Sequence, residues 1–123
     1  MKMIFVIGIG SFIGGAFRYM LSNFIQNKFL LKFPFGTLTV NITGCLLIGI
    51  IYELSDKGNL SNEWKLFLAT GILGGFTTFS AFSIETISLM QEGEIFYATV
   101  YIILSVLLGL LATYIGISIV KIF

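Results

Sequence analysis

The sequence predicts an all-α membrane protein with four transmembrane helices. Its 123 residues are 57% hydrophobic and only 11% charged, with a mean hydropathy of +1.02, whereas an average soluble domain carries roughly 25% charged residues. Apolar residues come in blocks, and not in the alternation that a closed barrel needs. A spanning helix takes about 20 residues. We therefore expect a single four-helix domain over residues 1–123, with helices at about residues 3–25, 35–54, 66–90 and 95–120.

The connections between these blocks are short and polar. The first contains the only proline, Pro34, just before the second block, a position that suits the start of a helix. The second contains an Asp-Lys-Gly-Asn turn at residues 56–59, followed by Ser61 and Asn62, either of which can cap the third helix. The third, at residues 91–94, is about as short as a helical hairpin allows. Four crossings place both termini on one side of the membrane.

Glycines are concentrated inside the apolar blocks. Gly10–Gly14 and Gly71–Gly75 have the small-xxx-small spacing that lets membrane helices approach closely. Gly74 and Gly75 differ from the others because Phe-Thr-Thr-Phe-Ser follows at once. Two glycines and two β-branched threonines weaken a helix. We expect a break in the third helix here, where unwound carbonyl groups can hold a cation such as Na⁺.

The positive residues near the helix ends are nearly balanced between the two sides. Cytoplasmic ends normally carry the excess of Lys and Arg, and a balanced count is expected of a chain that inserts in both orientations. The balance favours an antiparallel dimer of inverted copies as a hypothesis. The residues counted are Lys2, Lys57, Lys65 and Lys121 on the side of the termini, against Lys28, Lys32 and, inside the first block, Arg18.

Arg18 and Glu85 are the charged residues well within the apolar blocks. Charges inside a membrane are costly enough to be functional candidates. Arg18 lies towards the C-terminal end of its predicted helix, where it either snorkels to the interface or attracts an anion in a vestibule. Glu85 either fixes helix packing as a buried, hydrogen-bonded carboxyl group or lines an aqueous entrance. The sequence leaves both alternatives open.

Neutral polar side chains form a second group of candidates. Asn41 either hydrogen-bonds to a neighbouring helix or offers its NH₂ group to an anion, and Thr37, four residues earlier, shares its helical face. Ser80 supplies a hydroxyl group on the third block. Tyr101 and Ser105 are four residues apart on the fourth block and belong to one polar track. Such groups offer an anion hydrogen bonds without a full charge.

Phe79 and Phe82 are an i, i+3 pair on one face of the third helix. An aromatic pair at this spacing is more often a packing contact than a site. The edge of a phenyl ring nevertheless carries the positive part of its quadrupole, so an edge-on ring can face a small anion. The pair is therefore a candidate anion site.

The residue content argues against an enzyme. Histidine is absent and Cys45 is the single cysteine, which removes the commonest general base, the commonest metal ligand and any multi-thiolate metal site. The glycines of the first block lack the Lys-Ser/Thr pair of a phosphate loop. A net charge of +1 provides no basic surface for nucleic acid. We expect neither catalytic residues nor a nucleic-acid partner.

Four stretches of the chain carry a family signature: IGGAFRYMLSNF, FGTLTVNITGCLLIG, WKLFLATGILGGFTTFSAFSIE and the short link QEGE. In this order they resemble the Fluc-type fluoride channels, also called the CrcB family, over essentially the whole chain. GGFTTFSxFSxE together with GTLxVNxxG is highly specific, whereas a lone Gly-Gly or Phe pair would mean little.

The resemblance implies a four-helix subunit that forms an antiparallel, dual-topology homodimer in the lipid bilayer, with two fluoride pores along its interface. It implies that Phe79 and Phe82 meet fluoride through their ring edges. It also implies that Asn41 is a pore-lining amide and that Ser80 and Thr37 belong to a polar track beside it.

The resemblance assigns roles to the remaining candidates as well. Gly74 and Thr77 correspond to break positions whose backbone carbonyl groups, from both subunits, coordinate a structural Na⁺. Arg18 corresponds to an arginine on the vestibule side, and Glu85 to the acid that closes the third-helix motif.

Two positions depart from the family pattern. Ala81 stands where the family usually has threonine, so one hydroxyl group of the third-helix track is missing. Gly109 stands where some members have serine. The second departure leaves the roles of Tyr101 and Ser105 open.

The resemblance implies passive fluoride export across a bacterial plasma membrane, which gives resistance to fluoride that entered as HF. Neutral donors suit this function because conduction requires binding sites that an ion can also leave. The alternative is a small proton-coupled multidrug or cation transporter, also with four helices and dual topology. It needs a membrane-embedded acid, and the first block carries Arg18 instead. A non-transporting assembly subunit would leave the break in the third helix unexplained.

Overall fold

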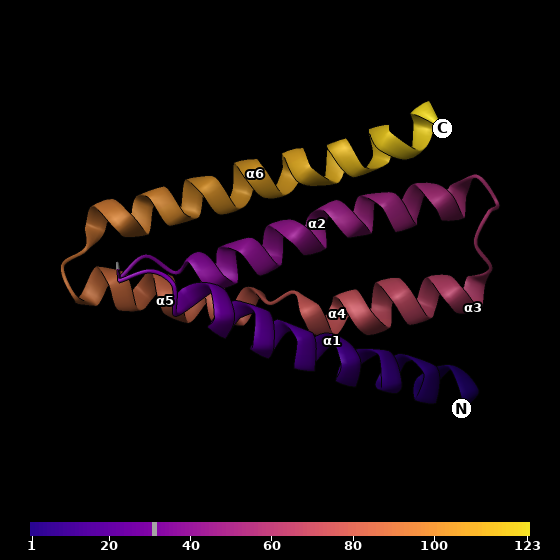
Figure 1. Cartoon of the computed structure of the whole chain (residues 1–123), viewed down its shortest axis with the longest axis horizontal. Coiled ribbons are helices and arrows are strands. Elements are labelled where there is room, and N and C mark those ends of the chain that lie inside the picture. The colour runs from indigo at the N-terminus through magenta and orange to yellow at the C-terminus, as the bar shows by residue number, and fades with distance from the viewer. Residues whose placement is uncertain (31) are drawn as a thin grey trace.

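The computed structural model describes residues 1–30 and 32–123, and over these residues it contains helices and no strand (Figure 1). Four helical stretches are long and apolar enough to cross a membrane, which confirms an all-helical membrane protein. The third stretch starts at residue 62, earlier than the predicted 66. The elements are α1 (Lys2–Gln26), α2 (Phe35–Asp56), α3 (Asn62–Lys65), the π-helix η1 (Leu66–Leu73), α4 (Gly74–Phe76), α5 (Phe79–Gln91) and α6 (Ile95–Ile122).

The helices form a bundle with two distinct ends. α2 lies along α6, and α1 lies along η1 and α4 (Figure 1). Both termini and the α2–α3 connection lie at one end, which we call the terminal end. The α1–α2 and α5–α6 connections lie at the other, which we call the hairpin end. The termini therefore share one end, as four crossings predict.

Side-chain and backbone hydrogen bonds hold the hairpin end together. The Gln26 side chain donates from Nε2 to the Phe33 carbonyl oxygen over 2.9 Å, and its Oε1 accepts from the Gly36 N–H, also over 2.9 Å. The tight α5–α6 connection turns at Gly93, whose φ of +81° is disfavoured for residues with a side chain. The Gln26 contacts fix the start of α2 relative to the end of α1, and the turn at Gly93 leads α5 directly into α6.

Glycines allow α1 to approach the third span so closely that the two backbones are in contact. A methyl group added at Gly14 would overlap the carbonyl oxygen of Ile72, and one at Gly75 would overlap the carbonyl oxygen of Ser11. α2 and α6 make a similar contact, in which a methyl group on Gly116 would overlap the Leu46 carbonyl oxygen. Small residues thus permit close helix packing, as the small-xxx-small spacing predicts.

The third span is broken, but not at the glycines. Gly74 remains helical, with φ −61° and ψ −36°, and Gly75 lies within α4 against α1. The break lies at Thr77 and Thr78, whose ψ values of 156° and 121° are those of extended backbone. The β-branched pair therefore leaves the helix, whereas the glycines serve the close contact with α1. The π-helix η1 before the break was not predicted.

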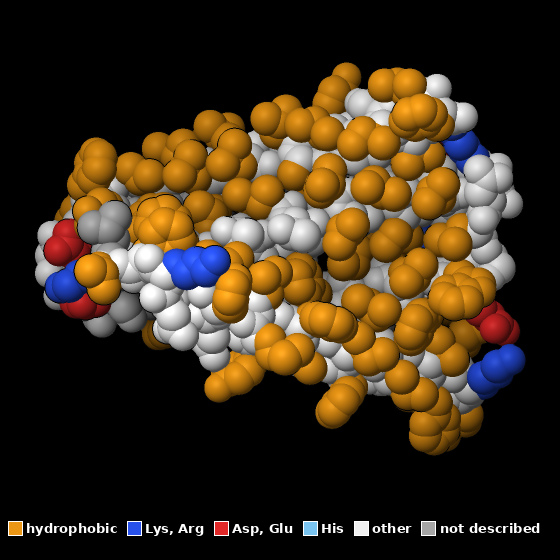
Figure 2. Space-filling view, viewed as in Figure 1, with side chains coloured by type: hydrophobic (Ala, Val, Ile, Leu, Met, Phe, Trp, Pro, Cys, Tyr) orange, Lys and Arg blue, Asp and Glu red, His pale blue; other side chains and the backbone are white. Residues whose placement is uncertain are grey.

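Most apolar side chains face outwards. Among the described residues, Tyr101 and Val40 are the largest fully buried side chains, and the buried apolar residues form two small clusters. Hydrophobic side chains cover most of the face shown in Figure 2, and acidic side chains lie at its two ends. This distribution suits a chain surrounded by lipid and by other apolar protein surfaces.

Replacing Gly14 by alanine tests the close contact between α1 and η1. The new methyl group would overlap the Ile72 carbonyl oxygen, and overpacking of this kind costs about 1–3 kcal/mol. We expect a lower thermal unfolding midpoint in detergent for Gly14→Ala. Gly8→Ala is the matched control on the same helix, because nothing lies within 4 Å of its added methyl group. Equal midpoints for the two variants would contradict this packing.

Candidate functional site

The break in the third span is held by the side-chain amide of Asn41 on α2. Its Nδ2 donates to the Thr78 carbonyl oxygen over 2.9 Å, and its Oδ1 accepts from the Thr78 N–H over 2.8 Å. The amide therefore replaces both backbone hydrogen-bond partners that Thr78 would have in a helix. Of the two alternatives for Asn41, a hydrogen bond to a neighbouring helix is observed. An amide NH₂ group has two donors, and the bond to Thr78 uses one.

The break creates the start of a new helix in the middle of the span. Thr78 is the N-cap of α5, and its Oγ1 accepts from the Ala81 N–H over 3.1 Å. The Ser80 hydroxyl lies 3.1 Å from the same Thr78 oxygen. The first N–H groups of a helix carry partial positive charge and favour anions. The N-terminus of α5 at Phe79 therefore provides an electropositive point inside the membrane span.

The break also exposes the carboxyl end of α4. In a continuous helix the Thr78 N–H would donate to the Gly74 carbonyl oxygen, but it donates to Asn41 instead. Arg18 Nε donates to the Gly75 carbonyl oxygen over 3.1 Å. A cation is stabilised near the carboxyl end of a helix. Arg18 therefore contacts the third span and does more than snorkel to the interface.

A central cavity of about 410 Å³ lies beside the break. The rings of Phe79 and Phe82 are 5.4 Å apart at 45° to one another. Phe79 is 78% exposed, so the cavity opens on the outer face of the chain. The predicted residues that line it are Asn41, Gly74, Thr77, Phe79, Phe82 and Ser105.

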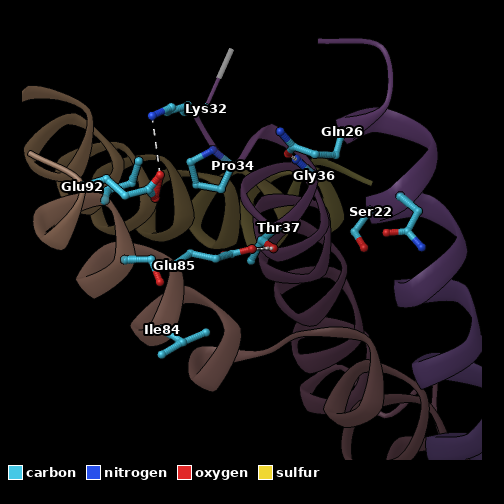
Figure 3. A pocket seen from close by; sticks show the side chains of 12 residues that line it. Ser22, Gln26, Lys32, Pro34, Gly36, Thr37, Ile84, Glu85 and Glu92 are labelled. Atoms are coloured by element: carbon cyan, nitrogen blue, oxygen red, sulfur yellow. Dashed lines mark hydrogen bonds and ion pairs between the residues drawn. The ribbon is translucent and has the colours of Figure 1, made fainter. Parts of the chain in front are cut away.

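A second cavity, of about 300 Å³, lies at the hairpin end and is lined by Thr37 and Glu85 (Figure 3). Glu85 Oε2 accepts from Thr37 Oγ1 over 2.7 Å, and Glu85 Oε1 accepts from the Tyr101 hydroxyl over 2.8 Å. The Tyr101 ring lies 5.0 Å from the Phe82 ring. Glu85 is therefore a hydrogen-bonded carboxyl group between helices that also lines this cavity.

Comparison with known proteins identifies the family. The profile described as "CrcB-like protein, Camphor Resistance (CrcB)" matches residues 5–117. A protein of Flavobacterium psychrophilum named "Fluoride-specific ion channel FluC" is 46% identical over 98% of both chains. A protein of the same name from Clostridium perfringens is 48% identical over 90% of this chain and 88% of its own length. Another, from Parabacteroides distasonis, is 41% identical over 98% of this chain and 94% of its own length. The chain belongs to the CrcB family.

This membership confirms the family resemblance inferred from the sequence motifs. The CrcB match includes the residues of the break and both cavities. The relatives carry the name of an ion channel, a class that is not enzymatic. Within residues 1–30 and 32–123, no group of three or more His, Cys, Asp and Glu side chains is placed to hold a metal ion.

The structure separates some residues that the sequence grouped together. Thr37 and Asn41 share a face of α2, yet Thr37 lines the hairpin-end cavity and Asn41 the central one. Ser80 is exposed and lines neither of these two cavities. Tyr101 is fully buried between them. Gly109 is buried near Cys45 Sγ, which would lie 3.5 Å from an added methyl group, so this position packs against α2 within the CrcB subunit.

The central role of Thr78 was missed from the sequence. The sequence indicated Thr78 only as one of two β-branched threonines that weaken the helix, whereas it caps α5 and its backbone binds Asn41. A signal was present, because threonine is a preferred N-cap and precedes Phe79 directly. The partner Asn41 lies on another helix, and no local pattern identifies it.

Replacing Asn41 by leucine tests whether its amide holds the break. The part-buried Thr78 N–H and C=O would lose their partners, at up to about 1–3 kcal/mol for each unsatisfied group. We expect the thermal unfolding midpoint in detergent to fall by several degrees. Ser105→Ala is the control, because it alters the lining of the same cavity without removing the pairing with Thr78. An Asn41→Leu protein as stable as the control would show that the amide does not hold the break.

Proposed function

We propose that the chain forms a fluoride-selective channel. The observation that carries this proposal is the central cavity, where two phenyl rings and neutral polar groups meet the N-terminus of α5. Three relatives at 41–48% identity bear the name of a fluoride-specific ion channel. The arrangement offers a small anion several partial positive charges and no full one.

The chemistry of the central cavity suits an ion that must bind and leave again. Fluoride is small and tightly hydrated, so a pore must replace its water with several donors. The second N–H of Asn41, the Ser105 hydroxyl and the edges of Phe79 and Phe82 can supply them. A full positive charge at this point would hold the ion too strongly for conduction. Ser80, beside the N-cap Thr78, would extend the polar path on the exposed face.

Tyr101, between the two cavities, and Thr37 and Glu85, in the lining of the second, would continue this path towards the hairpin end. Thr37 and Tyr101 both donate to Glu85. Their hydroxyl groups can turn towards a passing anion only by leaving the carboxyl group. Glu85 would thus position these two donors rather than bind fluoride itself. Arg18, on the opposite side of α4 at Gly75, would contribute positive potential at an entrance.

A second, inverted copy of the chain would complete each pore. The central cavity opens on an outer face where Phe79 is 78% exposed and Gly74 is also exposed. An inverted copy would cover this face about a two-fold axis, as in an antiparallel homodimer. The weak bias of positive residues, four lysines at the terminal end against Lys28, Lys32 and Arg18 on the other side, suits dual topology.

A structural Na⁺ at the centre of this dimer fits the donor set around the break. The Gly74 carbonyl oxygen loses its usual helical donor because the Thr78 N–H binds Asn41. Thr77 lies in extended backbone and lines the same cavity. Carbonyl oxygens of unwound membrane helices are ligands for Na⁺. The carbonyl groups of Gly74 and Thr77 from both copies would hold the ion.

The cellular setting follows from this function. We place the channel in a bacterial plasma membrane as a multi-pass protein, where it would release fluoride that entered the cytoplasm as HF and dissociated there. Passive flow of this kind gives fluoride resistance. The alternative of a proton-coupled transporter is not favoured, because both oxygens of Glu85 already accept hydrogen bonds from Thr37 and Tyr101.

Fluoride efflux from liposomes containing the purified protein tests the channel. We expect fluoride to leave electrogenically when a protonophore balances the charge, and chloride to be retained. Phe82→Ile should lower the efflux rate by roughly tenfold, equivalent to ~1.4 kcal/mol, because it removes a ring edge from the cavity. Phe12→Ile is the control, since Phe12 is 78% exposed on α1. Wild-type liposomes that retain fluoride would refute the channel, and an unchanged Phe82→Ile rate would refute the pore assignment.

The same liposomes test the sodium site. Exchanging all Na⁺ for N-methylglucamine should lower fluoride efflux, and adding Na⁺ back should restore it, because the ion would hold the two broken helices together. Efflux that is independent of Na⁺ over the full exchange would contradict the proposed role of the Gly74 and Thr77 carbonyl groups.

A further inference from the structure

The hairpin-end cavity carries an ion pair to which the proposed pore assigns no role. Lys32 Nζ lies 3.5 Å from Glu92 Oε1, and both residues line the cavity (Figure 3). Lys32 comes from the α1–α2 connection, and Glu92 caps the C-terminal end of α5. The pair therefore joins the two connections that enclose this end of the bundle.

The charge balance of this cavity is unfavourable to an anion. Among its lining residues, all within the described part of the chain, Lys32 is the one cation, and Glu85 and Glu92 are the acids. One lysine against two glutamates gives a formal charge of −1. An anion entering here would be repelled by the carboxylates unless the Lys32 ammonium group lay near its path.

The cavity lies next to the proposed fluoride site. Glu85 accepts a hydrogen bond from Tyr101, whose ring is 5.0 Å from the ring of Phe82 in the central cavity. A charge at Lys32 or Glu92 therefore acts on an ion approaching that site from the hairpin end. Such a charge acts by raising or lowering the local concentration of the anion in the cavity.

The ion pair is exposed enough to open and close. The side chains of Lys32 and Glu92 are 59% and 50% exposed, and exposed ion pairs contribute little to stability. The ammonium group can therefore exchange the Glu92 carboxylate for a passing anion without disturbing the fold.

We propose that Lys32 draws fluoride into the hairpin-end cavity and that Glu92 competes with fluoride for the Lys32 ammonium group. The pair thereby sets the rate at which the anion enters the pore. This inference rests on the proposed fluoride channel. Lys32 and Glu92 are positioning residues that act through local electrostatic potential rather than by forming the pore site.

Unitary fluoride currents in planar lipid bilayers test the inference, because a current per channel needs no correction for protein amount. At low ionic strength, Lys32→Gln should reduce the current about two- to threefold, since two carboxylates then face the anion alone. Glu92→Gln should increase it by a similar factor, since it frees the ammonium group. A pair that served only to tie the two connections together would be broken by either change, and both currents would shift in the same direction.

Salt dependence and a second ion pair provide the controls. Adding the salt of a large impermeant anion such as gluconate to 1 M shortens the screening length to about 3 Å, and the opposite shifts should disappear. Lys2 and Glu63 form a comparable exposed pair at the terminal end, with 3.4 Å between Nζ and Oε1, and neither residue lines the two cavities. Lys2→Gln and Glu63→Gln should leave the current unchanged.

The outcomes separate this inference from the channel itself. A wild-type protein without fluoride current refutes the proposed function. A conducting wild type with opposite, salt-sensitive shifts for Lys32→Gln and Glu92→Gln supports the inference. If the two variants shift the current in the same direction, leave it unchanged, or shift it equally at 1 M salt, the inference is overturned and the proposed channel function still stands.

Discussion

The two hydrogen bonds between the Asn41 amide and the Thr78 backbone decide where the third membrane span is interrupted. A backbone N–H and C=O without partners in the middle of a bilayer cost several kcal/mol each. A break is therefore tolerated only where another group satisfies them. Asn41 satisfies both at once, and α5 can then start afresh with Thr78 as its cap.

The same break places two helix termini within one span: the C-terminal end of α4, with partial negative charge, and the N-terminus of α5, with partial positive charge. The N-terminus of α5 at Phe79 lies on the side of the central cavity, and partial positive charge there suits an anion. The carboxyl end of α4 meets Arg18 at the Gly75 carbonyl oxygen. In a chain with only 11% charged residues, the backbone at the helix termini thus supplies partial charges inside the membrane span. A site for a small anion therefore needs no buried lysine or arginine at its centre.

The sequence predicted the elements whose signals are local, and it missed the partners that lie on other helices. Four apolar blocks predicted the four spans, and Phe79 and Phe82 lie at the cavity as their shared motif indicates. The break was expected within residues 74–78 and lies at Thr77 and Thr78, but the sequence could not single out Thr78, because composition shows that a helix is weak and not which residue another helix will hold. The bond from Tyr101 to Glu85 and the pairing of Asn41 are contacts across helices, which no spacing rule reveals.

The central claim is that Asn41 holds the break that brings the phenylalanine ring edges to fluoride. Solid-state NMR on protein in lipid bilayers, with ¹³C-labelled phenylalanine rings, can detect ¹⁹F–¹³C dipolar contacts directly. With 13 phenylalanines in the chain, Phe82→Ile identifies the signal of that ring by difference. The account predicts a fluoride contact to the ring carbons of Phe82 that is lost in Asn41→Leu. A contact that persists unchanged in Asn41→Leu, or its absence from the wild-type protein, would contradict it.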